Sequence, residues 1–178
     1  MPPVQPCPLP ASALLQRYAG GQGYTDCFFS DVPRAVPHAA FVAAFYTSAV
    51  FRLERWLIAL LAGRPSTDAQ ARQLGQGALD AFSAWTVEAR ADNQLLMADR
   101  SGRTRSWLMV APSEAPDGGT RLFFGSAVVP VVHRATGRPA LGAAFTALLG
   151  FHKLYSKLLL RAAASRLMRA TPDTRRPS

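Results

Sequence analysis

The spacing of apolar residues between positions 81 and 133 constrains the fold most. Trp85, Val87 and Ala89 alternate with polar residues, and three further apolar segments follow at 93–99, 104–111 and 120–132. A repeat of two residues is typical of a strand with one buried face. The connections between the segments are short and rich in turn-forming residues, such as "RSGR" and "PSEAPDGG". This part of the chain therefore predicts four antiparallel strands in succession.

The stretch "ADRSGRTRSWLMV" (98–110) contains three arginines and could be either a phosphate-binding patch or a hairpin. Phosphate sites need glycine-rich backbone amides at a helix start, or basic residues interleaved with stacking aromatics, and neither pattern is present. Gly102 can supply the positive φ of a turn, so we predict a hairpin with Arg103 in water. Alternation places Arg103 and Arg105 on the same strand face as Trp107 and Met109.

A single long helix is predicted over 140–169. Lys153, Lys157 and Arg161 follow one another at intervals of four and form a basic stripe on one side. The opposite side is expected to lie on the sheet, and it carries Phe145, Leu148, His152, Tyr155, Leu159 and Ala162.

The remaining segments complete an α+β chain. We expect a short helix at 11–19, a strand at 23–33 and a long helix at 38–62. A further helix, capped by Ser66 or Thr67, should run to about Leu79. The whole predicts a curved antiparallel sheet wrapped on a long C-terminal helix.

Length and composition bound the domain and its partners. The 178 residues suit one domain at 11–170, with a proline-rich disordered lead at 1–10 and a basic disordered tail at 171–178. The formal net charge is +9, concentrated after residue 150. This charge fits a weak contact with anionic membranes through the final helix and tail, or else a solvated helix face.

Several functional classes lack support in the sequence. The two cysteines and three histidines show no metal-ligand spacing, and no cofactor or nucleic acid is expected. The N-terminus does not resemble a signal peptide. The apolar segment 41–63 has charges at its middle, which favours a buried helix over a membrane span. We therefore expect a cytoplasmic protein of undetermined oligomeric state.

The run "FSAWTVEAR … QLLMADRSGRTRSWLMV … GTRLFFGSAVVP … GFHKLYSKLLLRAA" resembles the DUF2867 family of uncharacterised bacterial proteins. That family is in turn similar to the START-like, or helix-grip, superfamily of polyketide cyclases and lipid-transfer domains. The resemblance covers roughly residues 23–168. It implies a cavity between the concave sheet face and the last helix, sized for an apolar ligand. Members often carry a nicotinamide-binding reductase domain, but this chain has no G-x-G-x-x-G motif after a strand.

Large apolar side chains could line such a cavity. By alternation Trp85, Met97, Trp107, Met109 and Phe124 can share one sheet face. The alternative is that they fill a core against the last helix. The full set of predicted ligand-binding residues is Trp85, Met97, Arg105, Trp107, Met109, Phe124, Phe145, Leu148 and Leu159.

Four polar residues are candidates for catalysis. His152 and Tyr155 are neighbours on the predicted helix and could transfer protons to and from a carbonyl. His152 could equally be a buried histidine with satisfied ring nitrogens. Asp26 and Glu54 are the other candidates, although each could form a structural ion pair instead, Asp26 with Arg105 or Arg121.

Three functions remain open on the sequence alone. The leading hypothesis is a binding protein that encloses a small, largely apolar molecule. The second is a cofactor-free enzyme, such as a cyclase, isomerase or dehydratase, and the third is lipid handling at a membrane surface.

Overall fold

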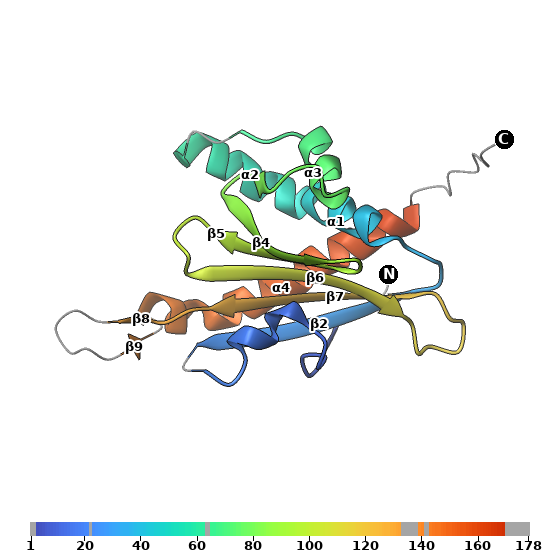
Figure 1. Ribbon diagram of the computed structural model, residues 1–178, viewed down its shortest axis with the longest axis horizontal. Helices are drawn as coiled ribbons and strands as arrows, with labels where there is room; N and C mark the ends of the chain where they lie inside the picture. The colour runs from blue at the N-terminus through green and yellow to red at the C-terminus, as the bar shows by residue number, and fades with distance from the viewer. Residues whose placement is uncertain (1–2, 22, 63–64, 133–138, 141–142, 170–178) are drawn as a thin grey trace.

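A seven-stranded antiparallel sheet forms the centre of the protein in the computed structural model (Figure 1). The structure describes residues 3–21, 23–62, 65–132, 139–140 and 143–169, without the side chains of 54, 57–59, 61–62, 131–132, 139–140 and 143–149. The strands lie in the order β1-β2-β7-β6-β5-β4-β3. Their bounds are β1 Gln5–Pro6, β2 Tyr24–Val32, β3 Ala81–Phe82, β4 Trp85–Ala91, β5 Gln94–Asp99, β6 Thr104–Pro112 and β7 Thr120–Val128. A separate pair is formed by β8 (Val131–Val132) and β9 (Pro139–Ala140).

The predicted succession of antiparallel strands is confirmed, since β4 to β7 pair in chain order. The hairpin between β5 and β6 turns at Gly102, whose φ is +70°. The Asp99 carboxylate accepts hydrogen bonds from the backbone N–H groups of Arg103 and Thr104, at 2.8 and 2.9 Å. Arg103 is exposed, so this basic stretch is a turn.

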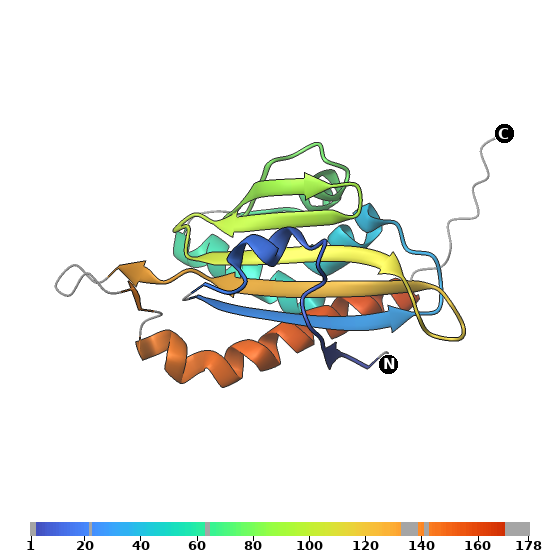
Figure 2. The ribbon, with the colours of Figure 1, turned by 60° about the horizontal axis from the view of Figure 1, so that its bottom comes forward.

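The four α-helices of the described residues lie on one side of the sheet, the inner face (Figures 1 and 2). They are α1 (His38–Tyr46), α2 (Ala49–Ala62), α3 (Asp68–Gly75) and the long α4 (Ala143–Arg169). α4 crosses this face and packs on it through its C-terminal half, where Leu160, Ala163 and Ala164 are fully buried. The predicted α+β, helix-grip-like arrangement is confirmed.

The expectation of one continuous helix over 38–62 is wrong. Thr47 ends α1, and the Ser48 hydroxyl accepts a hydrogen bond from Phe51 N–H at 3.2 Å, as a capping residue does. The two hydroxyl side chains therefore divide the segment into α1 and α2. For α3 the predicted cap is confirmed at Thr67, which forms a capping box with Gln70.

The N-terminal segment (residues 3–19) covers the other side of the sheet, the outer face (Figure 2). Its 3₁₀ helix η1 (Leu14–Tyr18) is attached through Gln94 of β5. The Gln94 amide accepts from Leu14 N–H at 2.9 Å and donates to the Ser12 carbonyl at 3.0 Å. Residues 3–10 thus differ from the disordered lead that composition predicts: β1 pairs with β2 at the sheet edge, where a proline without N–H is tolerated.

The prediction that Trp107 and Met109 share a sheet face with Phe124 is wrong. The register sets Trp107 opposite Gly125 and Leu108 opposite Phe124, and opposite residues share a face. Trp107 and Met109 therefore lie on the outer face under the N-terminal segment, whereas Phe124 lies on the inner face.

β4 contains a second departure from simple alternation. A register shift between Val87 and Ala89 marks a β-bulge. As a result Trp85 and Val87 pack on the inner face, but Ala89 packs on the outer face. Glu88 follows the inner-facing Val87 and binds Tyr18 and Arg105 on the outer face.

His38, at the start of α1, should make stability depend on pH. Burial lowers its pKa to about 4, and its Nε2 has no hydrogen-bond partner in the described part of the chain. Between about pH 6.5 and pH 4 the unfolded chain binds a proton that the folded protein does not. The free energy of unfolding therefore decreases by about 2–3 kcal/mol as the pH is lowered through this range. Urea unfolding at about pH 7 and about pH 4.5 should show a larger loss for the wild type than for His38→Gln. Equal losses would contradict this role of His38.

Candidate functional site

A cavity of about 150 Å³ lies between the inner sheet face and α4. Apolar side chains from the sheet and three helices form most of its wall, namely Phe45, Phe51, Trp85, Phe124 and Leu159. Polar side chains also border it, namely Thr104, Ser106, Ser126, His152, Tyr155 and Ser156. The cavity is therefore amphipathic, with polar groups from β6, β7 and α4.

Two of those polar residues, Ser126 and His152, belong to a hydrogen-bonded group at the end of β2 and β7. The Ser126 hydroxyl donates to Asp26 Oδ1 at 2.6 Å and lies 2.8 Å from His152 Nε2. Ser126 N–H and the Tyr24 hydroxyl also donate to the same carboxylate, each at 3.0 Å. An ionised carboxylate only accepts, so the serine proton points to Asp26 and His152 Nε2–H donates to the serine oxygen. We call Tyr24, Asp26, Ser126 and His152 the polar cluster.

The polar cluster is well shielded from water. The Asp26 side chain is 7% exposed and that of His152 is 22% exposed. Burial, with the nearby Asp26 charge, raises the pKa of the Tyr24 phenol well above its ordinary value. Tyr24 therefore stays a hydrogen-bond donor to Asp26, and Asp26 holds Ser126 and, through it, the His152 ring.

Six of the predicted site residues line the cavity. They are Trp85, Arg105, Phe124, His152, Tyr155 and Leu159. Met97 lies on the same face but in the packed core, without lining the cavity. Asp26 lies behind Ser126 and contacts His152, at 3.6 Å from Nε2 to Oδ2.

Two of the other predicted residues lie elsewhere. Trp107 and Met109 are on the outer face, as described above. Arg105 borders the cavity, but its guanidinium binds Glu88 and Tyr18 on the outer face. The side chains of Phe145, Leu148 and Glu54 lie outside the described residues.

The predicted ion pairs of Asp26 are also wrong. Arg105 pairs with Glu88 at 2.7 Å and Arg121 pairs with Asp31 at 2.9 Å. Asp26 lies directly opposite Ser126 in the pairing of β2 with β7, and its partners are hydroxyl and N–H groups. Arg55 of α2 pairs with Asp68 at the start of α3.

Sequence reasoning missed Ser126, Ser106 and Ser156. Ser126 follows Phe124 by two positions in β7, so alternation alone would have placed both on the inner face. Ser106 is likewise two positions before the inner-facing Leu108. Phe45 and Phe51 had no such signal, because their place in the wall depends on how α1 and α2 pack.

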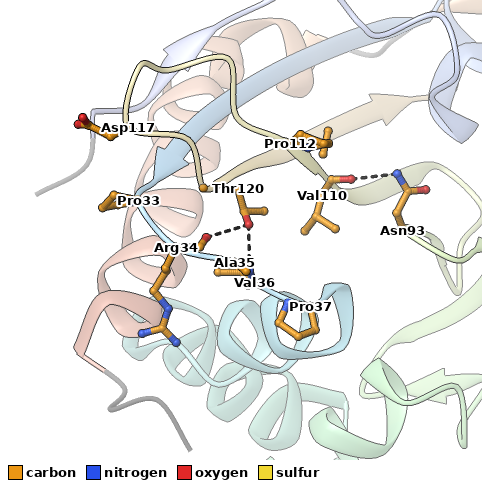
Figure 3. Close-up of a pocket in the computed structure, with 12 residues that line it drawn as sticks. Pro33, Arg34, Ala35, Val36, Pro37, Asn93, Val110, Pro112, Asp117 and Thr120 are labelled. Carbon is orange, nitrogen blue, oxygen red and sulfur yellow. Dashed lines mark hydrogen bonds between the residues drawn. The ribbon is translucent and has the colours of Figure 1, made fainter.

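A larger, open hollow of about 680 Å³ lies at the opposite end of β6 and β7 (Figure 3). Two of its polar side chains, those of Thr120 and Asn93, join loops to strands. The Thr120 hydroxyl donates to the Arg34 carbonyl and accepts from Val36 N–H, both at 2.9 Å. Asn93 donates to the Val110 carbonyl at 2.9 Å. These contacts make it a structural junction, and we regard the cavity under α4 as the candidate site.

The exposed side of α4 combines charge with apolar surface. Lys153, Lys157 and Arg161 are exposed as predicted, and the nearby Phe151 and Leu154 are 65% and 55% exposed. None of the helices in the described ranges is both long and apolar enough to cross a bilayer. The contact with anionic membranes stays a prediction; the tail at 171–178 lies outside the described residues.

Comparisons with known proteins give little further information. No protein-family model matches the chain, and no curated protein is similar to it. The crystal structure of CalU16 from Micromonospora echinospora is similar at 14% identity, covering 93% of this chain and 92% of that chain, with a TM-score of 0.30. A likeness at that level carries no functional argument, so the site must be judged on its own geometry.

Proposed function

We propose that this protein binds a small, largely apolar molecule with one polar group in the cavity under α4. The observation that carries the proposal is the lining of the cavity: an aromatic and aliphatic wall, closed on one side by hydroxyl groups and an imidazole. Ligand sites commonly combine an apolar wall with a few placed polar groups.

The size of the cavity limits the ligand. An apolar cavity of about 150 Å³ holds a molecule the size of benzene. The aromatic rings of Phe45, Phe51 and Phe124 line this cavity of about 150 Å³, so a ligand with a single ring fits its size and its wall.

Hydroxyl groups are available to recognise the polar end. Within the described residues the Ser106 and Ser156 hydroxyls form no hydrogen bond, although both residues are buried and line the cavity. A ligand that carries a donor or acceptor can therefore form a hydrogen bond there that the described protein groups do not supply.

Binding of phenol and toluene to the purified protein tests the proposal. Both probes have one ring, and we expect phenol to bind about 2–10-fold more tightly, the usual net effect of one hydrogen bond. Native mass spectrometry of the same preparation would reveal a co-purified ligand. Chemical-shift changes of residues around the cavity, followed by NMR, would report the affinities.

Ser156→Leu is expected to fill the cavity and reduce phenol binding at least about 10-fold. Lys157→Leu introduces the same side chain on the neighbouring exposed position and should leave binding unchanged. If folded Ser156→Leu binds phenol as the wild type does, the cavity is not the binding site.

The polar cluster supports a second candidate function, that of a cofactor-free enzyme. His152 lines the cavity and is hydrogen-bonded through Ser126 to Asp26, which fixes its ring. Tyr155 also lines the cavity and stacks on Phe151, with ring centroids 6.1 Å apart. Such groups could abstract and return a proton beside a carbonyl. The DUF2867 resemblance stays a prediction from the sequence and adds nothing to this choice.

A further inference from the structure

The pair Cys7 and Cys27 lies outside the candidate site, at the junction of the N-terminal segment and β2. Their Sγ atoms are 3.3 Å apart and share a hydrogen bond. Cys7 N–H also donates to the Cys27 carbonyl at 3.1 Å, which continues the pairing of β1 with β2 by one residue. The two side chains therefore stand opposite each other on the outer face.

We propose that Cys7 and Cys27 are a redox-active pair that a hydroperoxide converts to a reversible disulfide. A disulfide has an S–S length of about 2.05 Å, so the sulfurs need to approach by about 1.2 Å from their present distance of 3.3 Å. Rotation of the half-exposed Cys7 side chain toward the buried Cys27 can supply this, because the backbones are already held together.

The surroundings distinguish the two thiols. The hydrogen bond with Cys27 lowers the pKa of Cys7, and the positive charge of Arg121 acts in the same direction, against the effect of burial. The same hydrogen bond and burial raise the pKa of Cys27. Cys7 is thus the thiol that forms a thiolate and attacks, and Cys27 is the thiol that resolves.

The reaction is balanced with hydrogen peroxide as the oxidant. The Cys7 thiolate attacks one peroxide oxygen, the O–O bond breaks, and a sulfenic acid forms with release of hydroxide. Cys27 then attacks the Cys7 sulfur, its proton is taken up by the departing oxygen, and the S–O bond breaks as the S–S bond forms. Two thiols lose two electrons in total, and one peroxide becomes two molecules of water.

The disulfide would attach the N-terminal segment covalently to the central sheet. At present β1 consists of two residues only, and the segment covers the buried Trp107, Met109 and Phe123. A cross-link between positions 20 residues apart restricts the unfolded chain. We expect the melting temperature to rise by about 5–10 °C on oxidation.

Treatment of the reduced full-length protein with hydrogen peroxide tests the proposal. The expected product is a monomer whose mass has decreased by two hydrogen atoms, with a peptide linking positions 7 and 27 and no thiol open to alkylation. Dithiothreitol should restore both thiols and the original melting temperature. Two thiols that still react with iodoacetamide, or a disulfide between two molecules, would overturn the proposal.

Single variants separate the two roles. In Cys27→Ser the sulfenic acid on Cys7 has no resolving partner and should be trapped by dimedone. In Cys7→Ser the remaining thiol is buried, 5% exposed, and should stay unmodified over the same exposure. Equal labelling of the two variants would overturn the assignment of Cys7 as the attacking thiol.

Discussion

Replacing Trp107 with alanine is expected to lower the free energy of unfolding by about 3–5 kcal/mol. The side chain is fully buried on the outer face, over Gly125, where an added Cβ would lie 3.0 Å from the indole ring. Its Nε1–H also donates to the Gln94 amide oxygen at 2.8 Å, and that amide anchors the N-terminal segment. The substitution therefore opens a cavity and loosens a contact between distant parts of the chain. Urea unfolding monitored by circular dichroism measures the loss.

Arg103→Ala is the matched control from the same hairpin. Arg103 is exposed beside Gly102, and exposed substitutions usually change stability by no more than about 0.5 kcal/mol. Because Trp107 lies away from the cavity, its replacement should leave phenol affinity unchanged in the folded fraction. Similar unfolding midpoints for the two variants would refute the packing described for the outer face.

His152→Gln should have the largest effect on chemistry under the second candidate function. If the protein is such an enzyme, the α-hydrogens of cyclohexanone should exchange with D₂O faster in the presence of the wild type than in buffer alone. Glutamine can keep a hydrogen bond to Ser126 but cannot carry the proton, so the acceleration should fall about 10²–10⁴-fold. Exchange is followed directly by NMR of the ketone.

The same variant distinguishes binding from catalysis. If the protein only binds its ligand, His152→Gln should change phenol affinity by less than about 10-fold, and the wild type should not accelerate exchange. Lys153→Gln, at the exposed neighbouring position, controls for the charge of α4. Accelerated exchange that is equal in the wild type and His152→Gln would remove His152 from the enzyme hypothesis.

The sequence predicted the strands β4 to β7 and the helix α4 because their periodicities are local and long. It assigned the wrong face to Trp107 because β6 is apolar on both sides: Trp107, Leu108 and Met109 are all buried. Alternation shows a face only where one side is polar. The pairing of β6 with β7 determines which face Trp107 occupies, and the sequence of β6 alone does not reveal that pairing.

The polar cluster shows a similar limit at the site. Asp26 and Ser126 are 100 residues apart, and no local pattern favours pairing Asp26 with Ser126 over pairing it with an arginine. The N-terminal residues were misjudged for another reason. Proline-rich composition is typical of disorder, but here the segment packs Cys7 and Leu9 on an apolar sheet face that would otherwise be exposed.

The pairing of β2 with β7 has a consequence for how the chain folds. Tyr24 pairs with Val128, so a strand made early in synthesis waits for the seventh strand before it can join the sheet. The hairpins of β4 to β7 involve short loops and can form first. When β2 joins the sheet, the whole chain between β2 and β7 is closed into one long loop. The entropy cost of this step slows folding relative to a helical protein of equal size. Until that step Phe28 of β2 lacks its place in the inner-face core, and a ribosome-bound chain would expose it.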